Sequence, residues 1–222
     1  MSPVRDARAP APPSRREAKK ALHRRKILET AREVFFRDGF MAANLDEVAQ
    51  IAKVAKGTLY RYFDNKGELY VAVLSHNGEI FERKMREAAA SGASAVERMR
   101  AVGRFYYEHW TRNREYFQIF WALENQAVIG ELPPGVVEEV ARLWENCLRI
   151  LADVVERGTK DGTFGRCDAW EVANILWTVA NGLIQTELVA TRRELRRRKL
   201  DRVFEDTVEL FLRGLANPAS PG

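Results

Sequence analysis

The sequence lacks the residues and motifs on which metal sites, disulfide frameworks and common catalytic centres depend. Its 222 residues include only two cysteines, Cys147 and Cys167, and three histidines, His23, His76 and His109. None of them has metal-ligand or Cys-x-x-Cys spacing, and no phosphate loop or Gly-x-Ser-x-Gly motif occurs. We expect no metal, no cofactor and no enzyme; a carboxylate pair built from distant residues is the enzymatic alternative left open.

Long apolar runs are also absent. No stretch reaches the roughly 18 apolar residues of a membrane span, and the Ala-, Pro- and Arg-rich start has no apolar segment of a secretory signal. The alternation of apolar and polar residues that is typical of strands does not occur between the helical patterns. The sequence therefore predicts an all-α, cytoplasmic protein without a membrane partner.

Positive charge is concentrated at one end of the chain. The net charge is +5, yet residues 1–66 hold 15 Lys and Arg against 8 Asp and Glu, whereas residues 67–222 hold 21 against 23. Such asymmetry is expected when one domain meets nucleic acid and the other does not.

Residues 44–66 have the layout of a short helix, a tight turn and a second short helix. Asn44 and Glu47 are spaced as the N-cap and N3 residues of the first helix. An apolar set that ends in Leu59 and Phe63 predicts the second helix over residues 56–63, held down on one side. This is the arrangement of a helix-turn-helix that reads double-stranded DNA.

The outer face of the second helix follows from its buried face. Because the two buried positions are one turn apart, Gly57 and Arg61 point away from the core, with Thr58 and Tyr60 beside them. Hydroxyl groups and cations bind phosphates, and base edges and thymine methyl groups supply specificity. These four residues are therefore candidates for DNA contact.

The segment from Lys56 to Lys66 resembles the signature of the TetR/AcrR family of one-component transcriptional regulators. The similarity extends upstream through residues 27–40, so it covers about residues 24–70. It implies nine helices, three of them in the DNA-binding head, and a homodimer. By position, the resemblance implies a groove-facing set of Lys56, Gly57, Thr58, Tyr60 and Tyr62, with Asn44 and Lys66 as phosphate anchors.

Two positions depart from the family pattern. Lys53 stands where a turn glycine is usual, and a left-handed lysine there would cost about 1 to 2 kcal/mol. Ala55 stands where a capping serine is common, and the lost cap would cost about 1 kcal/mol. Lys53 is interpreted equally well as a phosphate contact or as a solvated turn residue.

The domain boundaries are expected near residues 14, 65 and 217. Residues 1–13 and 217–222 should be disordered. Ser14 and Glu17 form a capping box for the first helix, and Gly39 fits its C′ position. The DNA-binding domain then spans 14–64, and the ligand-binding and dimerisation domain spans 65–216. The remaining helices are predicted over 66–89, 95–112, 114–128, 135–157, 169–192 and 196–215.

The last two helices predict an interface between two copies of the chain. Their apolar residues cover more of each helix than one buried face requires, which favours a two-fold four-helix bundle over a fully buried monomer helix. The basic run over residues 192–202 is interpreted as a solvated linker. The expected interface residues are Trp177, Ile184, Leu188, Phe204, Val208 and Phe211.

Aromatic crowding over residues 105–121 indicates either core packing or the lining of a cavity between helices. The second interpretation predicts a small apolar or aromatic effector, with a cationic one also compatible with the rings. The expected ligand residues are Phe105, Tyr106, Trp110, Phe117, Phe120, Trp121, Glu124, Trp144, Leu148, Trp177 and Asn181.

The combined prediction is a ligand-responsive repressor that a small molecule releases from a palindromic operator. The alternative is a constitutive or architectural helix-turn-helix protein without ligand control.

Overall fold

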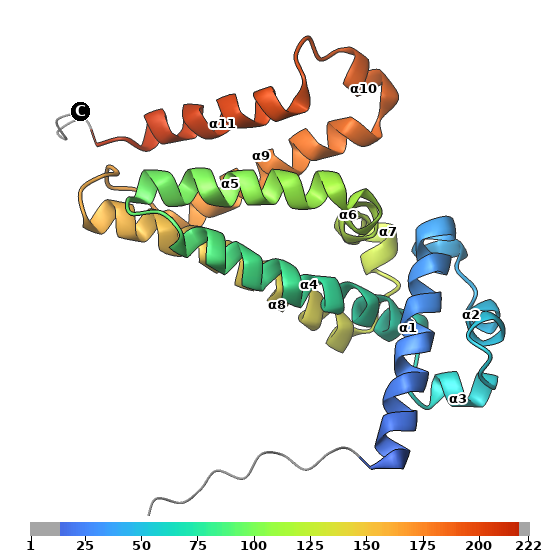
Figure 1. The fold of residues 1–222 in the computed structure, drawn as a ribbon. Helices are drawn as coiled ribbons and strands as arrows, with labels where there is room; N and C mark the ends of the chain where they lie inside the picture. The colour runs from blue at the N-terminus through green and yellow to red at the C-terminus, as the bar shows by residue number, and fades with distance from the viewer. Residues whose placement is uncertain (1–13, 218–222) are drawn as a thin grey trace, which may run out of the picture. The chain divides into compact units, whose positions relative to one another are not determined.

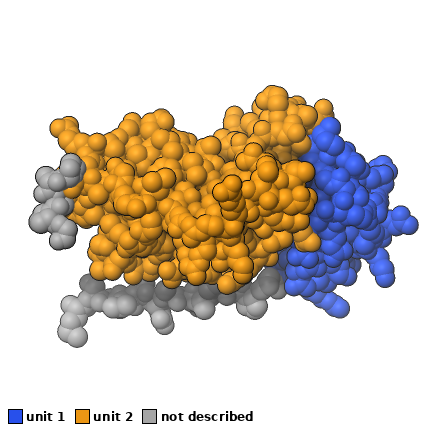
Figure 2. Space-filling model, turned by 90° about the horizontal axis from the view of Figure 1, so that it is seen from above, with its two compact units in different colours: residues 1–73 blue, residues 74–222 orange. Residues whose placement is uncertain are grey.

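The computed structural model describes residues 14–217 of the chain, and the described part contains eleven α-helices and no strand (Figure 1). The chain divides into two compact units, residues 1–73 (unit 1) and 74–222 (unit 2), which Figure 2 shows in blue and orange. Both predicted disordered ends, apart from Asn217, lie outside the described residues. The helices are α1 (Arg15–Ala42), α2 (Leu45–Ile51), α3 (Lys56–Tyr60), α4 (Lys66–Ala90), α5 (Ala95–Arg112), α6 (Arg114–Trp121), α7 (Gln126–Ile129), α8 (Pro134–Lys160), α9 (Ala169–Leu188), α10 (Ala190–Glu194) and α11 (Leu200–Leu215), with a 3-10 turn η1 (Ala122–Glu124).

The two helices beyond the predicted nine come from breaks that the sequence pattern did not reveal. The segment expected as one helix over 114–128 divides into α6, η1 and α7, because the Asn125 side chain accepts the Ala127 N–H at 2.8 Å and starts a new helix. The segment over 169–192 divides at Val189, whose backbone is extended (φ −108°, ψ 108°). The all-α prediction is confirmed, and the helix count was wrong.

The start of α1 follows the predicted local signals. The Ser14 hydroxyl accepts the Glu17 N–H at 3.3 Å, and the Glu17 carboxylate accepts the Ser14 N–H at 2.7 Å. These bonds also lower the pKa of Glu17. Gly39 has φ 72°, a left-handed conformation that glycine adopts without steric cost. The capping box is therefore confirmed, whereas Gly39 makes a kink within α1, which continues to Ala42 and has Ala43 as its C-cap.

The core of unit 1 joins α1 to the first turns of α4. The Tyr70 ring makes edge-on contacts with Phe35 and Phe40, with centroids 4.8 and 4.9 Å apart. At the start of α4, Asn65 accepts the Glu68 N–H at 2.8 Å. The two compact units divide after Val73, and the first part of α4 packs with α1 within unit 1.

Unit 2 is a bundle in which α5 lies against α8, α9 and α11, and α8 lies against α9 (Figure 1). Its core is rich in aromatic rings from α4, α5 and α6. The segment between α8 and α9 is bonded to the end of α11, because the Gly165 N–H donates to the Leu215 carbonyl at 2.8 Å. Among the described residues, no helix is long and apolar enough to cross a membrane.

Candidate nucleic-acid interface and ligand cavities

The turn between α2 and α3 is made by a left-handed lysine. Lys53 has φ 55°, which non-glycine residues adopt at a cost. Its N–H donates to the Gln50 carbonyl at 3.1 Å, and the Val54 N–H donates to the Ala49 carbonyl at 3.0 Å. The predicted departure from the usual glycine thus leaves a closed, hydrogen-bonded turn.

Helix α3 starts without a side-chain cap, because Ala55 occupies the N-cap. It ends at Tyr60 rather than at the predicted Phe63, and Arg61 is its C-cap. The Phe63 N–H still donates to the Leu59 carbonyl at 3.1 Å. Leu59 and Phe63 therefore stay on one side, with 0% and 2% of their surface exposed.

The opposite side of α3 is open to solvent. Lys56, Gly57 and Arg61 are exposed, Tyr60 retains 39% of its surface, and Thr58 is half-buried. A side chain at Gly57 would meet no atom within 4 Å, so the packing of unit 1 does not require glycine there. The predicted outward face of the helix is present.

Asn44 and Glu47, at the start of α2, form hydrogen bonds to α2 itself and to α1. The Asn44 side chain accepts the Asp46 N–H at 2.9 Å and so caps α2. Glu47 does not complete the predicted capping box, because its carboxylate accepts from Arg37 at 2.8 and 2.9 Å. The Lys56 ammonium donates to Asp46 at 2.8 Å, which raises the pKa of Lys56. Lys56 is exposed, so this ion pair is open to exchange for another anion.

Tyr62 and Lys66 have partners inside unit 1. The Tyr62 hydroxyl donates to the Lys20 carbonyl at 3.2 Å, which connects the segment after α3 to the basic start of α1. The Lys66 ammonium donates to the Met41 carbonyl at 3.0 Å and lies 4.8 Å from the Phe40 ring centre. Both residues therefore support the fold of unit 1, a role that the sequence did not predict.

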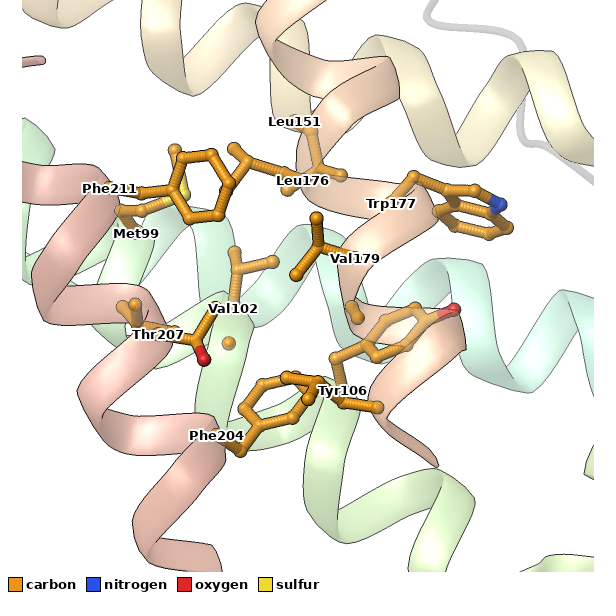
Figure 3. A pocket seen from close by; sticks show the side chains of 14 residues that line it. Met99, Val102, Tyr106, Leu151, Leu176, Trp177, Val179, Phe204, Thr207 and Phe211 are labelled. Atoms are coloured by element: carbon orange, nitrogen blue, oxygen red, sulfur yellow. The ribbon is translucent and has the colours of Figure 1, made fainter. Parts of the chain in front are cut away.

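An apolar hollow in unit 2 lies between α5, α9 and α11 (Figure 3). It contains about 510 Å³ of empty space, part of which is open to solvent. In Figure 3 the Phe204 and Phe211 side chains of α11 face Val102 and Val179 across this space. The lining residues are Met99, Val102, Gly103, Tyr106, Leu151, Leu176, Trp177, Val179, Ala180, Leu183, Phe204, Thr207, Val208 and Phe211.

A second cavity lies among α4, α5, α6, α8 and α9, and it contains about 520 Å³ of empty space, part of which is open to solvent. We call it the tryptophan cavity, because three indole rings line it. The residues that line the tryptophan cavity are Leu74, Asn77, Gly78, Phe81, Glu82, Trp110, Phe120, Leu123, Val140, Leu143, Trp144, Cys147 and Trp177.

The predicted ligand residues are divided among three locations. Tyr106 and Trp177 line the apolar hollow, and Trp110, Phe120, Trp144 and Trp177 line the tryptophan cavity. The others line neither: Phe117 is fully buried, Phe105, Trp121 and Leu148 pack against the core, Asn181 is buried, and Glu124 lies at the surface with its pKa raised by partial burial.

Several polar groups lie inside this aromatic core. The Tyr106 hydroxyl donates to the Asn181 carbonyl oxygen at 2.5 Å, and burial raises the pKa of Tyr106. The neighbouring Trp110 N–H acts to lower that pKa but does not reach hydrogen-bond geometry. Burial lowers the pKa of His109 to about 4, with a smaller effect from Lys84. Among the described residues, the buried side-chain atoms without a hydrogen-bond partner are His109 Nε2, Trp110 Nε1, Trp144 Nε1 and Gln185 Oε1.

The residues expected at a dimer interface are only partly available to a partner. Trp177, Ile184 and Phe204 are buried within their own chain, with 3–8% of their surface exposed, so they are core residues. Leu188, Val208 and Phe211 are half-buried. The apolar side chains that α9 and α11 do expose are Ile175, at 50%, and Leu210, at 63%.

Sequence reasoning missed the aliphatic and small residues of both cavities. Met99, Val102 and Leu151 follow the same helical spacing as core residues, so no local signal separates them from ordinary packing. Gly103 is a partial exception, because a Cβ there would lie 2.8 Å from the Val208 side chain. A glycine inside an aromatic helix is a signal of such close approach.

The basic run over residues 192–202 includes the short helix α10 and is largely exposed. Its one half-buried arginine, Arg196, donates to Thr186 at 3.2 Å and forms an ion pair with Glu187. Arg198 pairs with Asp206 at the far side of the loop. These contacts join α9 to α11, so part of the run is structural.

A hydrogen-bonded turn between two short helices, with an exposed and partly basic second helix, defines the class of helix-turn-helix DNA-binding domains. Residues 27–73 match the family model described as bacterial regulatory proteins, tetR family. The resemblance in the sequence is confirmed over these residues, and this part of the chain is similar to bacterial regulatory proteins of the tetR family.

Curated relatives and solved structures are also similar to this chain. The HTH-type transcriptional activator FasR of Mycolicibacterium smegmatis is 30% identical over 134 residues, which cover 60% of this chain and 59% of FasR. The HTH-type transcriptional repressor NicS of Pseudomonas putida is 25% identical over 138 residues, 62% of this chain and 64% of NicS. The matched region is thus less than two thirds of either relative.

The solved structures extend the likeness of the fold to most of the chain. The transcriptional regulator FadR from Bacillus subtilis, solved in complex with stearoyl-CoA, has a TM-score of 0.70 and 19% identity, and the match covers 86% of this chain and 98% of FadR. At this level of identity, the match shows that the folds are the same.

Proposed function

We propose that this chain is a homodimeric, ligand-responsive repressor whose α3 helices bind a palindromic operator. The observation that carries the proposal is the outer face of α3, where Lys56, Gly57, Tyr60 and Arg61 are exposed although the neighbouring Leu59 is fully buried. Cations and hydroxyl groups on an exposed recognition helix suit phosphates and base edges in the major groove.

Asn44, Thr58, Tyr62 and Lys66 complete the proposed DNA surface. Thr58 is half-buried beside Tyr60 on α3, and Asn44 caps the start of α2, where anions are favoured. Tyr62 and Lys66 contribute chiefly by fixing the basic start of α1 and the start of α4. We therefore propose that DNA contact is made mainly by α3 and by the exposed lysines and arginines of residues 15–26.

A homodimer supplies the second head that a palindrome requires. The exposed Ile175 on α9 and Leu210 on α11 support an isologous interface built from these two helices. Gly182 and Gly214 have open space where a Cβ would stand, so these helices can be approached closely. Leu188, Val208 and Phe211 lie partly at the surface and are proposed to join this interface.

An apolar or aromatic small molecule is the proposed effector, because the apolar hollow and the tryptophan cavity are lined mainly by apolar and aromatic side chains. The structure of FadR, which has the same fold, was solved with stearoyl-CoA, an example of an apolar chain held by this architecture. Binding would release DNA only by the difference in effector affinity between the two states, typically 1 to 3 kcal/mol. Because the proposed operator is DNA, we propose that the protein acts in the cytoplasm.

The test is selection from a random pool of duplex DNA by the full-length protein at near-physiological salt. Enrichment of a palindrome is expected, and a Tyr60→Ala, Arg61→Ala variant with an unchanged circular dichroism spectrum should enrich nothing. A folded protein that enriches no sequence would overturn the proposal. Titration of the operator complex with apolar compounds then separates ligand control from the alternative, a constitutive DNA binder.

The sign of regulation is tested separately, since FasR is named an activator and NicS a repressor. A reporter gene placed behind the selected operator should be silenced by this protein. Increased expression would replace repression by activation and leave the DNA-binding proposal unchanged.

A further inference from the structure

Two of the tryptophans that line the tryptophan cavity, Trp110 of α5 and Trp144 of α8, carry buried indole N–H groups. The described residues supply neither Nε1 atom with an acceptor in hydrogen-bond geometry, although the Trp110 N–H lies near the Tyr106 hydroxyl. Each atom is buried from solvent, and the Trp110 side chain as a whole is 4% exposed. Buried indole N–H groups ordinarily find an acceptor, so two on one cavity require an explanation.

Neighbouring rings hold the Trp110 indole in place. The Phe120 ring stacks on it with centroids 5.3 Å apart, and the Phe81 ring lies at 5.0 Å. A ring held on two sides loses little further freedom when its N–H is bound, which is the condition for a preorganised site.

The charge around the cavity limits what kind of acceptor can enter. Among the described side chains that line it, none is Lys, Arg or His, and the one charged group is the Glu82 carboxylate. Glu82 already accepts from Arg86 at 2.8 Å and from Asn146 at 3.1 Å. An anionic ligand group would lose its hydration here without gaining a counter-charge.

We propose that the effector carries an uncharged hydrogen-bond acceptor, such as a ketone, ester or thioester carbonyl, on an apolar body, and that Trp110 and Trp144 donate to it in the tryptophan cavity. This inference rests on the proposed ligand control and names the chemical class of the ligand. The donor pair distinguishes such a molecule from a plain hydrocarbon, and the absence of a cation among the described lining side chains distinguishes it from a carboxylate.

The test compares three probes of nearly equal shape: 2-acetonaphthone, 2-ethylnaphthalene and 2-naphthoate. Affinity for the full-length protein is measured by calorimetry at pH 7.5. Trp144→Phe and Trp110→Phe, which keep an aromatic ring and remove the N–H, should each weaken ketone binding about fivefold to tenfold and change hydrocarbon binding less than about twofold. The carboxylate should bind most weakly of the three.

Trp170→Phe is the matched control, because Trp170 lies on α9 beside Arg149 and lines neither cavity. It should leave all three affinities unchanged. If Trp110→Phe fails to fold, Trp144→Phe still tests the inference, since Trp144 is only half-buried.

Ligand binding to the two indole N–H groups can also be measured directly by NMR on the unmodified protein. The chain has five tryptophans, so the ¹H–¹⁵N spectrum of the full-length protein contains five indole signals. 2-Acetonaphthone should shift the Trp110 and Trp144 indole protons downfield, whereas 2-ethylnaphthalene should produce no such downfield shift.

The inference is overturned if the ketone does not bind, if it binds without moving these two signals, or if the Trp→Phe variants weaken both neutral probes equally. These results are distinct from failure of the proposed function. Ketone binding that leaves operator affinity unchanged would keep the cavity assignment and contradict ligand control. If a compound releases the operator but the Trp→Phe variants do not alter its affinity, ligand control is supported and the cavity assignment is contradicted.

Discussion

The two units assemble their candidate sites in different ways. In unit 1 the exposed face of α3 comes from Lys56 to Arg61, six consecutive positions of the chain. In unit 2 the tryptophan cavity draws on five helices, between Leu74 and Trp177. A surface made by one short helix is specified by local spacing, whereas a cavity is specified by how distant helices pack. The predictions below test this difference, from the largest expected effect to the smallest.

Leu59→Ala should destabilise unit 1 by about 3 kcal/mol, because it empties the fully buried position that holds the five-residue α3. Urea unfolding followed by circular dichroism measures the change. Ile51→Ala, at a position that is 48% exposed on α2, is the control and should cost less than about 0.5 kcal/mol. Equal effects of the two substitutions would show that α3 is not held by its apolar side.

Tyr60→Ala should weaken operator binding by about 1 to 2 kcal/mol while leaving the melting temperature nearly unchanged, because its side chain is 39% exposed and faces outward. Fluorescence anisotropy with the selected operator measures the loss. Tyr62→Phe is the contrasting variant, since its lost bond to the Lys20 carbonyl should lower stability more than affinity. A folded Tyr60→Ala protein with full affinity would remove Tyr60 from the DNA surface.

His109 should make unit 2 less stable as the pH falls from about 7 to 5. Burial lowers its folded pKa to about 4, below the unfolded value of about 6.5, so the unfolded chain binds more protons in this window. Because the side chain is only partly buried, the expected loss is about 1 kcal/mol relative to His109→Phe. Chemical unfolding at pH 7 and pH 5 tests it, and parallel pH profiles for the two proteins would contradict it.

Lys53→Gly should stabilise unit 1 by about 0.5 to 1 kcal/mol, because glycine adopts the φ of 55° without steric cost. Lys53→Ala is the control and should give no such gain. The same two variants also test whether Lys53 contacts DNA phosphate. If the Lys53 ammonium binds phosphate, both variants should reduce the salt dependence of operator binding by about one ion, and if it is merely solvated, neither should.

Short-range signals predicted unit 1 well. The capping box at Ser14, the left-handed Gly39 and the buried pair Leu59 and Phe63 each depend on residues within four positions of one another. The left-handed Lys53 was only a possibility raised by the family resemblance, which has a turn glycine at this position, and the structure decided it. The error in this unit concerns a partner farther away, because Glu47 binds Arg37 instead of capping α2. The bond from Lys66 to the Met41 carbonyl was likewise not predicted.

In unit 2, spacing predicted that aromatic residues would gather but not which of them would line a cavity. Phe117 and Trp110 occur in the same aromatic stretch, yet the first is enclosed in the core and the second lines the tryptophan cavity. The difference depends on how α8 and α9 approach α5, which no residue near either ring encodes. The breaks at Asn125 and Val189 escaped prediction because the surrounding sequence is helical in pattern.

By itself, the sequence determined the all-α class, the helix-turn-helix and its outer face, because helix periodicity, capping and turn conformation are set by neighbouring residues. Only the tertiary structure decided that Trp177, Ile184 and Phe204 belong to the core and that Trp110 and Trp144 share a cavity. An apolar side chain carries the same free-energy gain wherever it is buried, so the partner that buries it is chosen by packing and not by local pattern.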